Sequence, residues 1–170
     1  MPSRSLLLSI VPGVFVLDRI TKMLIESEVT PWDNFAVIPN FFSIVHTQNR
    51  GAAFGILSEA TGTWRSIFLI GLSMVVMLFV GGLFWQTLRS PTRGAALSIG
   101  LALVLGGALG NLYDRILRGS VTDFLLFYVG DYQWPAFNVA DSAISIGACL
   151  LLLDMWRGQR PVSQDVPSKS

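Results

Sequence analysis

The stretch PAFNVADSAISIGACLLLLDMW, residues 135–156, decides the fold of this chain and raises a question about it. From Val139 to Leu153 it is apolar or small apart from Asp141, two serines and one cysteine. Such a run is typical of a helix in lipid. A carboxylate is costly in hydrocarbon, so Asp141 indicates either a functional site or a buried partner.

The composition of the whole chain indicates a membrane protein. Hydrophobic residues make up 52% and charged residues only 14% of the 170 residues, which lies well outside the range of soluble domains. The net charge of +1 gives no reason to expect a nucleic acid as partner. Cys149 is the single cysteine, so it forms no internal disulfide, and we expect it to be a small buried hydrophobe.

Four segments are long enough to cross the hydrocarbon core, which takes about 20 residues of helix. They are residues 5–25, 64–88, 94–116 and 136–156. The first segment resembles a signal peptide, but it lacks a small-residue cleavage site and ends in charged residues, so we expect it to remain as a helix. The sequence therefore predicts a membrane α-helical fold with four transmembrane helices in one domain. Outer loops are expected at 26–63 and 117–135, with a disordered tail at 158–170.

Basic residues near the helix ends predict the orientation of the bundle. Six of them lie on one side: Arg4, Arg89, Arg93, Arg157, Arg160 and Lys169. The arginines on the other side are balanced by acidic residues. Because cytoplasmic loops carry an excess of Lys and Arg, we expect both termini to face the cytoplasm.

With this topology, the polar residues of the predicted helices gather at the outer surface. They end the first and third helices or begin the fourth: Asp18, Lys22, Asn111, Asp114, Arg115 and Asp141. Asn111 and Asp114 share a helix face beside Arg115, where they are expected to brace the bundle. The cytoplasmic half has only Asp154, which Arg157 can reach at i+3. This asymmetry predicts a site that faces outward at the depth of the outer headgroups.

Both outer loops predict β-structure. Pro39-Asn40 in the first and Gly130-Asp131 in the second each separate two runs rich in β-branched and aromatic residues. We therefore expect a small extracytoplasmic β-sheet cradle at the membrane surface. Aromatic rings, which are favoured at the interface, would anchor this cradle or would only fix the depth of the helices: Trp32, Phe35, Phe41, Phe42, Trp134 and Phe137.

Several short motifs have structural explanations. Asp18 and Lys22 stand at i, i+4 in the order that favours an ion pair. The glycines of GGALG, residues 106–110, have the small-xxx-small spacing that permits close contact between helices in lipid. Asn138 precedes Asp141 by three residues, as in a capping box. Asp141 can therefore serve only to satisfy the backbone at the helix start, and this alternative stays open.

Asp123 offers a chemical explanation for Asp141. It follows the turn-forming pair Gly119-Ser120, and a loop that folds back over the helix ends would bring the two carboxylates together. Two carboxylates that share a site hold one proton between them. One can then activate a water while the other protonates a leaving group. This is aspartic-protease chemistry, and peptide hydrolysis by this route needs no cofactor.

Other hydrolytic chemistries lack the residues that they need. His46 is the only histidine and is expected to be a strand residue, no HExxH motif occurs, and Cys149 lies on the cytoplasmic half of its helix, so a metal site is not expected. A serine nucleophile would need a base, and neither a GxSxG motif nor a second histidine is present. The carboxylate pair is the remaining option, with the acid and the base unassigned.

Five blocks of sequence, in order and at compatible spacing, resemble the motifs of bacterial lipoprotein signal peptidase, also called signal peptidase II. They are DRITK (18–22), NRGAAFGIL (49–57), GGALGNLYDR (106–115), GSVTDF (119–124) and PAFNVADS (135–142). The resemblance covers nearly the whole chain. Thr122 departs from the aliphatic residue more usual in the family before the first catalytic aspartate, and we expect this to alter packing and not chemistry.

The resemblance implies an aspartic endopeptidase of the bacterial cytoplasmic membrane that acts on diacylglyceryl-modified prolipoproteins. It would cut on the N-terminal side of the lipidated cysteine, as a monomer among membrane lipids and without a metal, cofactor or nucleic acid. By motif position, Asp123 and Asp141 resemble the catalytic dyad. Eight further residues resemble positions of the family that support the site or bind substrate: Asp18, Lys22, Asn49, Gly51, Asn111, Asp114, Arg115 and Asn138.

Two other classes of protein are alternatives. A small transporter or channel subunit would use Asp18, Asp114 and Asp141 as ion or proton sites. It predicts polar residues through the full depth of the bundle, whereas the cytoplasmic half of this chain is apolar. A noncatalytic membrane scaffold would have no need of paired carboxylates. If the Asp123→Asn variant cleaved prolipoprotein as fast as the wild type, the hypothesis of an aspartic endopeptidase would be excluded.

Overall fold

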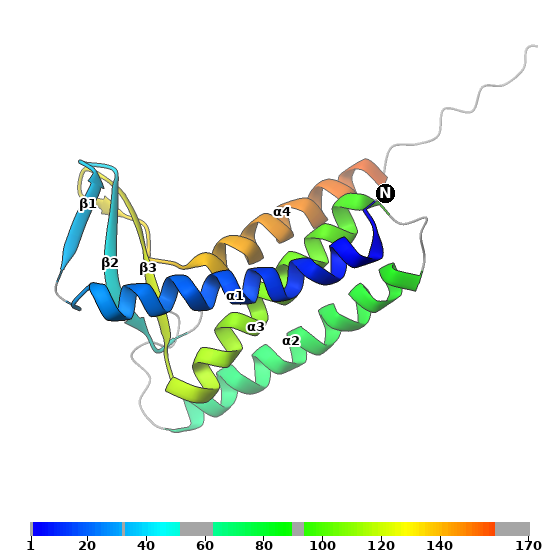
Figure 1. Cartoon of the computed structure of the whole chain (residues 1–170), viewed down its shortest axis with the longest axis horizontal. Coiled ribbons are helices and arrows are strands. Elements are labelled where there is room, and N and C mark those ends of the chain that lie inside the picture. Colours follow the sequence, from blue (N-terminus) through cyan, green and yellow to red (C-terminus); the bar gives the residue numbers. More distant parts are fainter. Residues whose placement is uncertain (1, 32, 52–62, 90–93, 159–170) are drawn as a thin grey trace, which may run out of the picture.

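The computed structural model describes residues 2–31, 33–51, 63–89 and 94–158. In chain order the elements are α1 (Arg4–Glu28), β1 (Asn34–Ile38), β2 (Phe42–Asn49), α2 (Thr63–Arg89), α3 (Ala95–Arg118), β3 (Val121–Val129), β4 (Tyr132–Gln133) and α4 (Val139–Gly158). In Figure 1 the helices lie side by side, with the sheet across one end of the bundle. The tail after Gly158, predicted to be disordered, and Trp32, a predicted anchor, lie outside the described residues.

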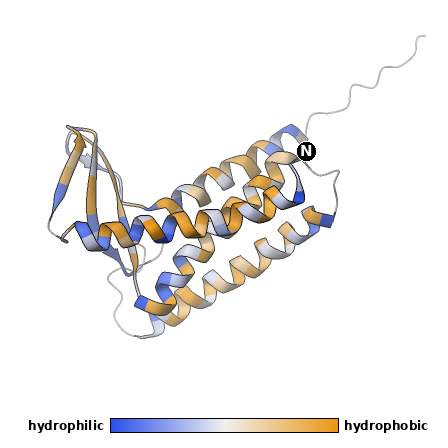
Figure 2. Cartoon of the chain, in the orientation of Figure 1, coloured by the Kyte–Doolittle hydropathy of each residue, from blue (hydrophilic) through white to orange (hydrophobic). Residues whose placement is uncertain are grey.

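Three of the helices, α2, α3 and α4, are long and apolar enough to cross a membrane. The 25 residues of α1 give it a comparable length, about 38 Å at 1.5 Å per residue. Its second half carries charges, and Asp18 and Lys22 are buried where α1 packs in the bundle. Most of the bundle is hydrophobic in Figure 2, and hydrophilic residues gather near the helix ends. The predicted four-helix membrane fold is confirmed.

The observed helix boundaries differ from the predicted ones where the ends are capped. α4 begins at Val139 and not at residue 136, because Phe137 is held in a β-bridge with Leu125 and Asn138 caps the helix. α1 continues past residue 25 to Glu28. α3 continues to Arg118 and ends at Gly119, whose φ of 72° lies in the left-handed region that favours glycine.

Small residues allow the helices to approach closely. A Cβ added to Gly106 would lie 2.8 Å from the Cβ of Val14 on α1, and one added to Gly107 would lie 2.4 Å from the carbonyl oxygen of Ala140 on α4. The GGALG segment is therefore a packing motif, as predicted. The expectation for Cys149 was wrong, because its side chain is exposed on α4; a small apolar residue is equally suited to a face that meets lipid.

The sheet has four antiparallel strands in the order β1-β2-β3-β4. Its turns fall at Asn40 and Gly130, which have φ of 64° and 58°, so both predicted turns are confirmed. His46 lies in β2, as predicted. The N-terminus and the last turn of α4 lie at the end of the bundle opposite the sheet (Figure 1), which agrees with the prediction that both termini share one side.

Asp154 does not form the expected contact with Arg157. Among the described residues no ion pair joins these two side chains. The Asp154 carboxylate instead lies against Gly94 at the start of α3, where an added Cβ would come within 2.4 Å of it. The expected contact failed because a neighbouring helix start occupies that face of α4.

Candidate active site

Asp123 and Asp141 come from different elements at the sheet end of the bundle. Asp123 lies within β3, opposite Thr47 of β2, and its side chain is buried. Asp141 lies in the first turn of α4. β3 follows α3 after a sharp turn at Gly119, so the chain folds back over the helix ends as predicted. Both aspartates line one cavity of about 660 Å³.

Asn138 joins the two carboxylates. Its side-chain amide donates to Oδ1 of Asp123 at 2.7 Å, and its Oδ1 accepts from the backbone N–H of Asp141 at 2.9 Å. The backbone N–H of Asn138 donates in turn to Oδ2 of Asp141 at 3.2 Å. The predicted capping box is therefore present. Capping occupies only one oxygen of Asp141, so it does not exclude a second role for this carboxylate.

Two further amides bind the remaining carboxylate oxygens. Asn111 on α3 donates to Oδ1 of Asp141 at 2.7 Å, and Asn49 at the end of β2 donates to Oδ2 of Asp123 at 3.0 Å. Within the described part of the chain, neither Asp123 nor Asp141 forms an ion pair. Neutral amides thus position both groups without neutralising them.

A buried ionic cluster lies behind the two aspartates, between α1 and α3. Lys22 binds Asp18 at 2.8 Å and Asp114 at 2.7 Å, and Arg19 also pairs with Asp114. The side chains of Lys22, Asp18 and Asp114 are essentially inaccessible to solvent. The predicted Asp18–Lys22 pair is confirmed, whereas the role of Arg19 was not predicted, although it stands inside the DRITK block.

The ionic cluster is connected to the aspartate pair by hydrogen bonds. Lys22 donates to Oδ1 of Asn111 at 3.1 Å. This contact turns the amide nitrogen of Asn111 toward Asp141, because a lysine ammonium only donates. Asp18 accepts from the backbone N–H of Ala140 at 3.0 Å, which fixes the start of α4. The cluster therefore orients the groups that bind Asp141.

Arg115 and the segment after β2 close another side of the site. Arg115 donates to the backbone oxygen of Gly51 at 3.2 Å and to that of Asn111 at 3.4 Å. The N–H of Gly51 donates to Oδ1 of Asn49 at 2.9 Å, so the amide nitrogen of Asn49 must face Asp123. Asn111 and Asp114, which were predicted to brace the bundle, both bind Lys22 of α1.

The surroundings of Asp123 change its proton affinity. Burial and the nearby Asp141 carboxylate raise the pKa of Asp123 from 3.8 to about 6. The hydrogen bonds from Asn49 and Asn138 act in the opposite direction but have the smaller effect. Because a raised carboxyl pKa favours the neutral form, Asp123 is suited to hold a proton close to neutral pH.

Thr122 points away from Asp123, as expected for neighbouring residues of a strand. Its hydroxyl donates to Glu26 at 2.8 Å and accepts from Gln48 at 3.1 Å, and Glu26 also pairs with Arg118. Sequence reasoning missed this network. The threonine itself was the available signal, because a buried hydroxyl needs a polar partner.

The cavity also has an apolar side in the membrane-spanning part of the bundle. Leu69, Leu72 and Val76 of α2 line it opposite Ile144 of α4. The two aspartates and Asn111 form its polar end. Such a combination, largely apolar walls with a few converging polar groups, is typical of sites for small molecules and peptides.

Comparisons with known proteins agree with this arrangement. A family model described as "Signal peptidase (SPase) II" matches residues 10–157. The chain is 49% identical over 147 residues to the lipoprotein signal peptidase of Solibacter usitatus (strain Ellin6076), covering 86% of this chain and 88% of that protein. It is 42% identical over 149 residues to that of Pseudomonas aeruginosa (strain UCBPP-PA14), covering 86% and 85%.

Two solved structures share the fold. One, described as a bacterial membrane enzyme structure by the in meso method at 2.3 Å resolution, superposes with a TM-score of 0.78 at 27% identity and covers 94% of this chain and 95% of its own. A second, described in the same words at 1.9 Å resolution, has a TM-score of 0.74 at 29% identity, covering 89% and 93%. Family model, sequence relatives and fold agree, and the chain belongs to the signal peptidase II family.

Proposed function

We propose that this chain is a membrane aspartic endopeptidase that removes the signal peptide from diacylglyceryl-modified prolipoproteins, with Asp123 and Asp141 as its catalytic dyad. The observation that carries the proposal is the bridge by Asn138, which binds both carboxylates beside one cavity. Membership of the family supports the activity and the substrate class. The eight other residues carried over from the matched motifs would position the dyad or the substrate.

The hydrogen bonds favour different roles for the two aspartates. Asp141 accepts from Asn111, whose amide is held by the Lys22 cation, and from a backbone N–H at the positive end of α4. These contacts orient the Asp141 carboxylate as the group that accepts a proton from water. Asp123 is buried and has the raised pKa, so it holds the shared proton.

The reaction follows from these protonation states. Asp141 takes a proton from a water, and the resulting hydroxide oxygen attacks the carbonyl carbon of the residue before the lipidated cysteine. Asp123 gives its proton to the carbonyl oxygen as the tetrahedral intermediate forms. The intermediate collapses with cleavage of the C–N bond, and the proton taken up by Asp141 passes to the leaving amine. As the C–N bond breaks, one hydroxyl of the intermediate returns a proton to Asp123, and the carbonyl of the released carboxyl group forms.

The place of the site in the bundle suits such a substrate. The dyad lies at the sheet end, and the apolar side of the cavity continues between membrane-spanning helices. A signal peptide anchored in lipid would enter from that side, and a diacylglyceryl group keeps the cysteine at headgroup depth. The excess of basic residues at the opposite end supports an outward-facing site. The transporter alternative would require polar groups deeper in the bundle.

Purified protein in detergent is incubated with a diacylglyceryl-modified prolipoprotein, and release of the signal peptide is followed. Asp123→Asn and Asp141→Asn are expected to lower the cleavage rate at least about 10³-fold. Asp131→Asn, an exposed acid in the β3–β4 turn, is the matched control and should cleave as the wild type does. Cleavage by all variants would exclude the dyad. No cleavage by folded wild type, together with ion flux in liposomes, would favour the transporter.

A further inference from the structure

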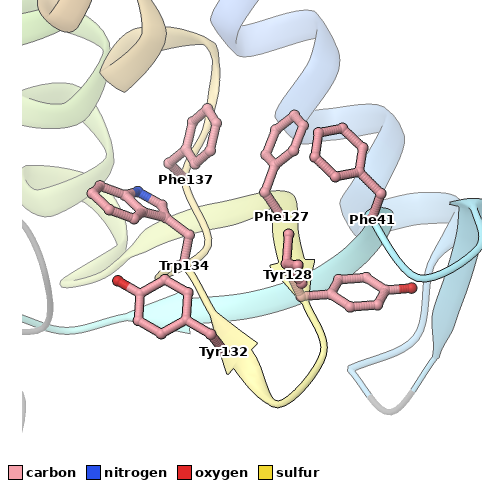
Figure 3. A pocket seen from close by; sticks show the side chains of 7 residues that line it. Phe41, Phe127, Tyr128, Tyr132, Trp134 and Phe137 are labelled. Carbon is pink, nitrogen blue, oxygen red and sulfur yellow. The ribbon is translucent and has the colours of Figure 1, made fainter.

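A second cavity, of about 360 Å³, lies on the sheet beside the dyad. Its walls expose almost only apolar surface and come from three segments of the chain. Phe41 follows β1, Phe127 and Val129 belong to β3, Tyr132 begins β4, and Trp134 and Phe137 lie between β4 and α4. In Figure 3 the rings of Phe41, Phe127 and Phe137 point to the same side of the sheet. We call this cavity the aromatic groove.

Stacked rings form the floor of the aromatic groove. The ring of Phe127 stacks on Phe137 with centroids 5.8 Å apart and on Phe42 at 4.8 Å, and it meets Phe41 edge-on at 5.4 Å. Such contacts fix the rings beyond what burial alone provides. The groove is therefore a formed feature of the sheet. Its rim stays accessible, because Val129 and Tyr132 are 66% and 67% exposed.

The aromatic groove adjoins the cavity of the dyad. Trp134 and Phe137 line both cavities. Phe137 also directly precedes Asn138, which binds both carboxylates. A group attached to a substrate residue at the dyad would therefore lie close to the groove, along the shared walls of Trp134 and Phe137.

The groove also lies where lipid is expected. The strands run across the end of the bundle, and the β1–β2 hairpin projects beyond the outer end of α4 (Figure 1). Because α4 spans the membrane, this part of the sheet covers the lipid next to that helix. An open apolar face of this kind marks a binding surface.

We propose that the aromatic groove binds one acyl chain of the substrate's diacylglyceryl group. The inference rests on the proposed function and names a subsite for the lipid. An acyl chain has no hydrogen-bonding groups and suits walls that offer almost none, whereas an extended peptide would leave its backbone groups unpaired there. The walls shared with the dyad cavity favour the lipid on the reacting cysteine over lipids of the bilayer.

The test compares two synthetic prolipoprotein peptides of identical sequence. The glyceryl group on the cysteine carries two palmitoyl chains in one peptide and two butanoyl chains in the other. KM and kcat are measured for wild type, Val129→Ser and Tyr132→Ser. Val37→Ser is the matched control, because Val37 is 53% exposed on β1 and lies outside the groove.

Each groove variant is expected to raise KM about tenfold for the dipalmitoyl peptide and to leave kcat unchanged. For the dibutanoyl peptide, KM should rise less than about twofold. Each buried methylene strengthens binding about fourfold, and a butanoyl chain has few methylenes to bury. If the dibutanoyl peptide is not cleaved, its inhibition constant against the dipalmitoyl peptide gives the same comparison. Val37→Ser should match wild type with both peptides.

Other results would overturn the inference in distinguishable ways. Equal changes with both peptides would indicate that the groove holds the peptide and not the acyl chain. The same selective rise in Val37→Ser would indicate a general contact of the sheet with detergent or bilayer. No change in either groove variant would leave the groove without a role in binding substrate. Failure of wild type to cleave the dipalmitoyl peptide would overturn the proposed function itself.

Discussion

The ionic cluster and the aspartate pair are two neighbouring groups of acidic residues, and they differ in the partners that bind their carboxylates. Asp18 and Asp114 are paired with Lys22 and Arg19. Asp123 and Asp141 are bound only by amides. Each acid of the cluster has a cation as its partner, whereas the two amide-bound carboxylates share one site and compete for a proton. The difference separates the acids that hold the structure from those suited to chemistry.

The largest effect is expected in the ionic cluster. Lys22→Met leaves two buried carboxylates with one cation fewer, so the free energy of unfolding should fall by about 3–5 kcal/mol. Thermal and denaturant unfolding in detergent measure this loss. Arg118→Met is the matched control, since the pair of Arg118 with Glu26 is partly exposed and is worth less than about 1 kcal/mol. Similar losses in both variants would contradict the structural role assigned to the cluster.

The aspartate pair should destabilise the fold, whereas the ionic cluster stabilises it. The size of this destabilisation should depend on pH. The fold raises the pKa of Asp123 from 3.8 to about 6, so the folded state binds the proton more tightly than the unfolded state. The cost is absent below 3.8, grows between the two values and is complete above about 6. A shift of this size corresponds to about 2–3 kcal/mol.

Asp123→Asn removes this titration. Relative to wild type, the variant should therefore gain about 2–3 kcal/mol of unfolding free energy between about pH 4 and pH 8. Unfolding curves at both pH values give the comparison. Asp131→Asn, whose side chain is exposed, should follow wild type at both. If the unfolding free energy of Asp123→Asn depended on pH as that of the wild type does, the fold would not raise the pKa of Asp123.

Asn111 links the two regions and sharpens the comparison further. Asn111→Ala removes the hydrogen bond to Asp141 and the acceptor for Lys22. A hydrogen bond to a charged group contributes about 2 kcal/mol, so kcat/KM for prolipoprotein cleavage should fall roughly 30-fold. Steady-state kinetics in detergent measure it. Asn111→Gln should lower kcat/KM to the same extent if its longer side chain makes neither contact. Full activity in Asn111→Ala would show that the catalytic step does not depend on the ionic cluster.

Much of the fold and several contacts of the candidate site could be predicted because the signals are local. The lengths of the apolar runs predicted four helices, and Asn40 and Gly130 marked turns between β-prone runs. The Asp18–Lys22 pair and the Asn138–Asp141 capping box follow from spacing within one helix. These features depend on residues three or four apart, which a helix brings together whatever surrounds it.

The contacts that were missed join distant segments. The pairing of Arg19 with Asp114 and the network of Thr122 with Glu26 depend on how α1 is rotated against α3 and β3. The start of α4 was placed too early, because Phe137 is held by Leu125 across the sheet. The sequence alone does not specify these rotations and pairings, since they result from packing of the whole bundle.

The smallest effect concerns which carboxylate holds the proton. Asn49 donates to Asp123 and lowers its pKa, so Asn49→Ala should raise that pKa further. If Asp123 is the acid, activity is lost as pH rises and Asp123 ionises, and the alkaline limb of the pH profile of kcat/KM must move to higher pH. Thr47→Val is the control, because Thr47 donates only to the backbone oxygen of Asp123. If Asp123 were instead the base, it would have to be ionised to act, and the same substitution would move the acidic limb to higher pH. The limb that moves therefore identifies the role of Asp123, and through the shared proton that of Asp141.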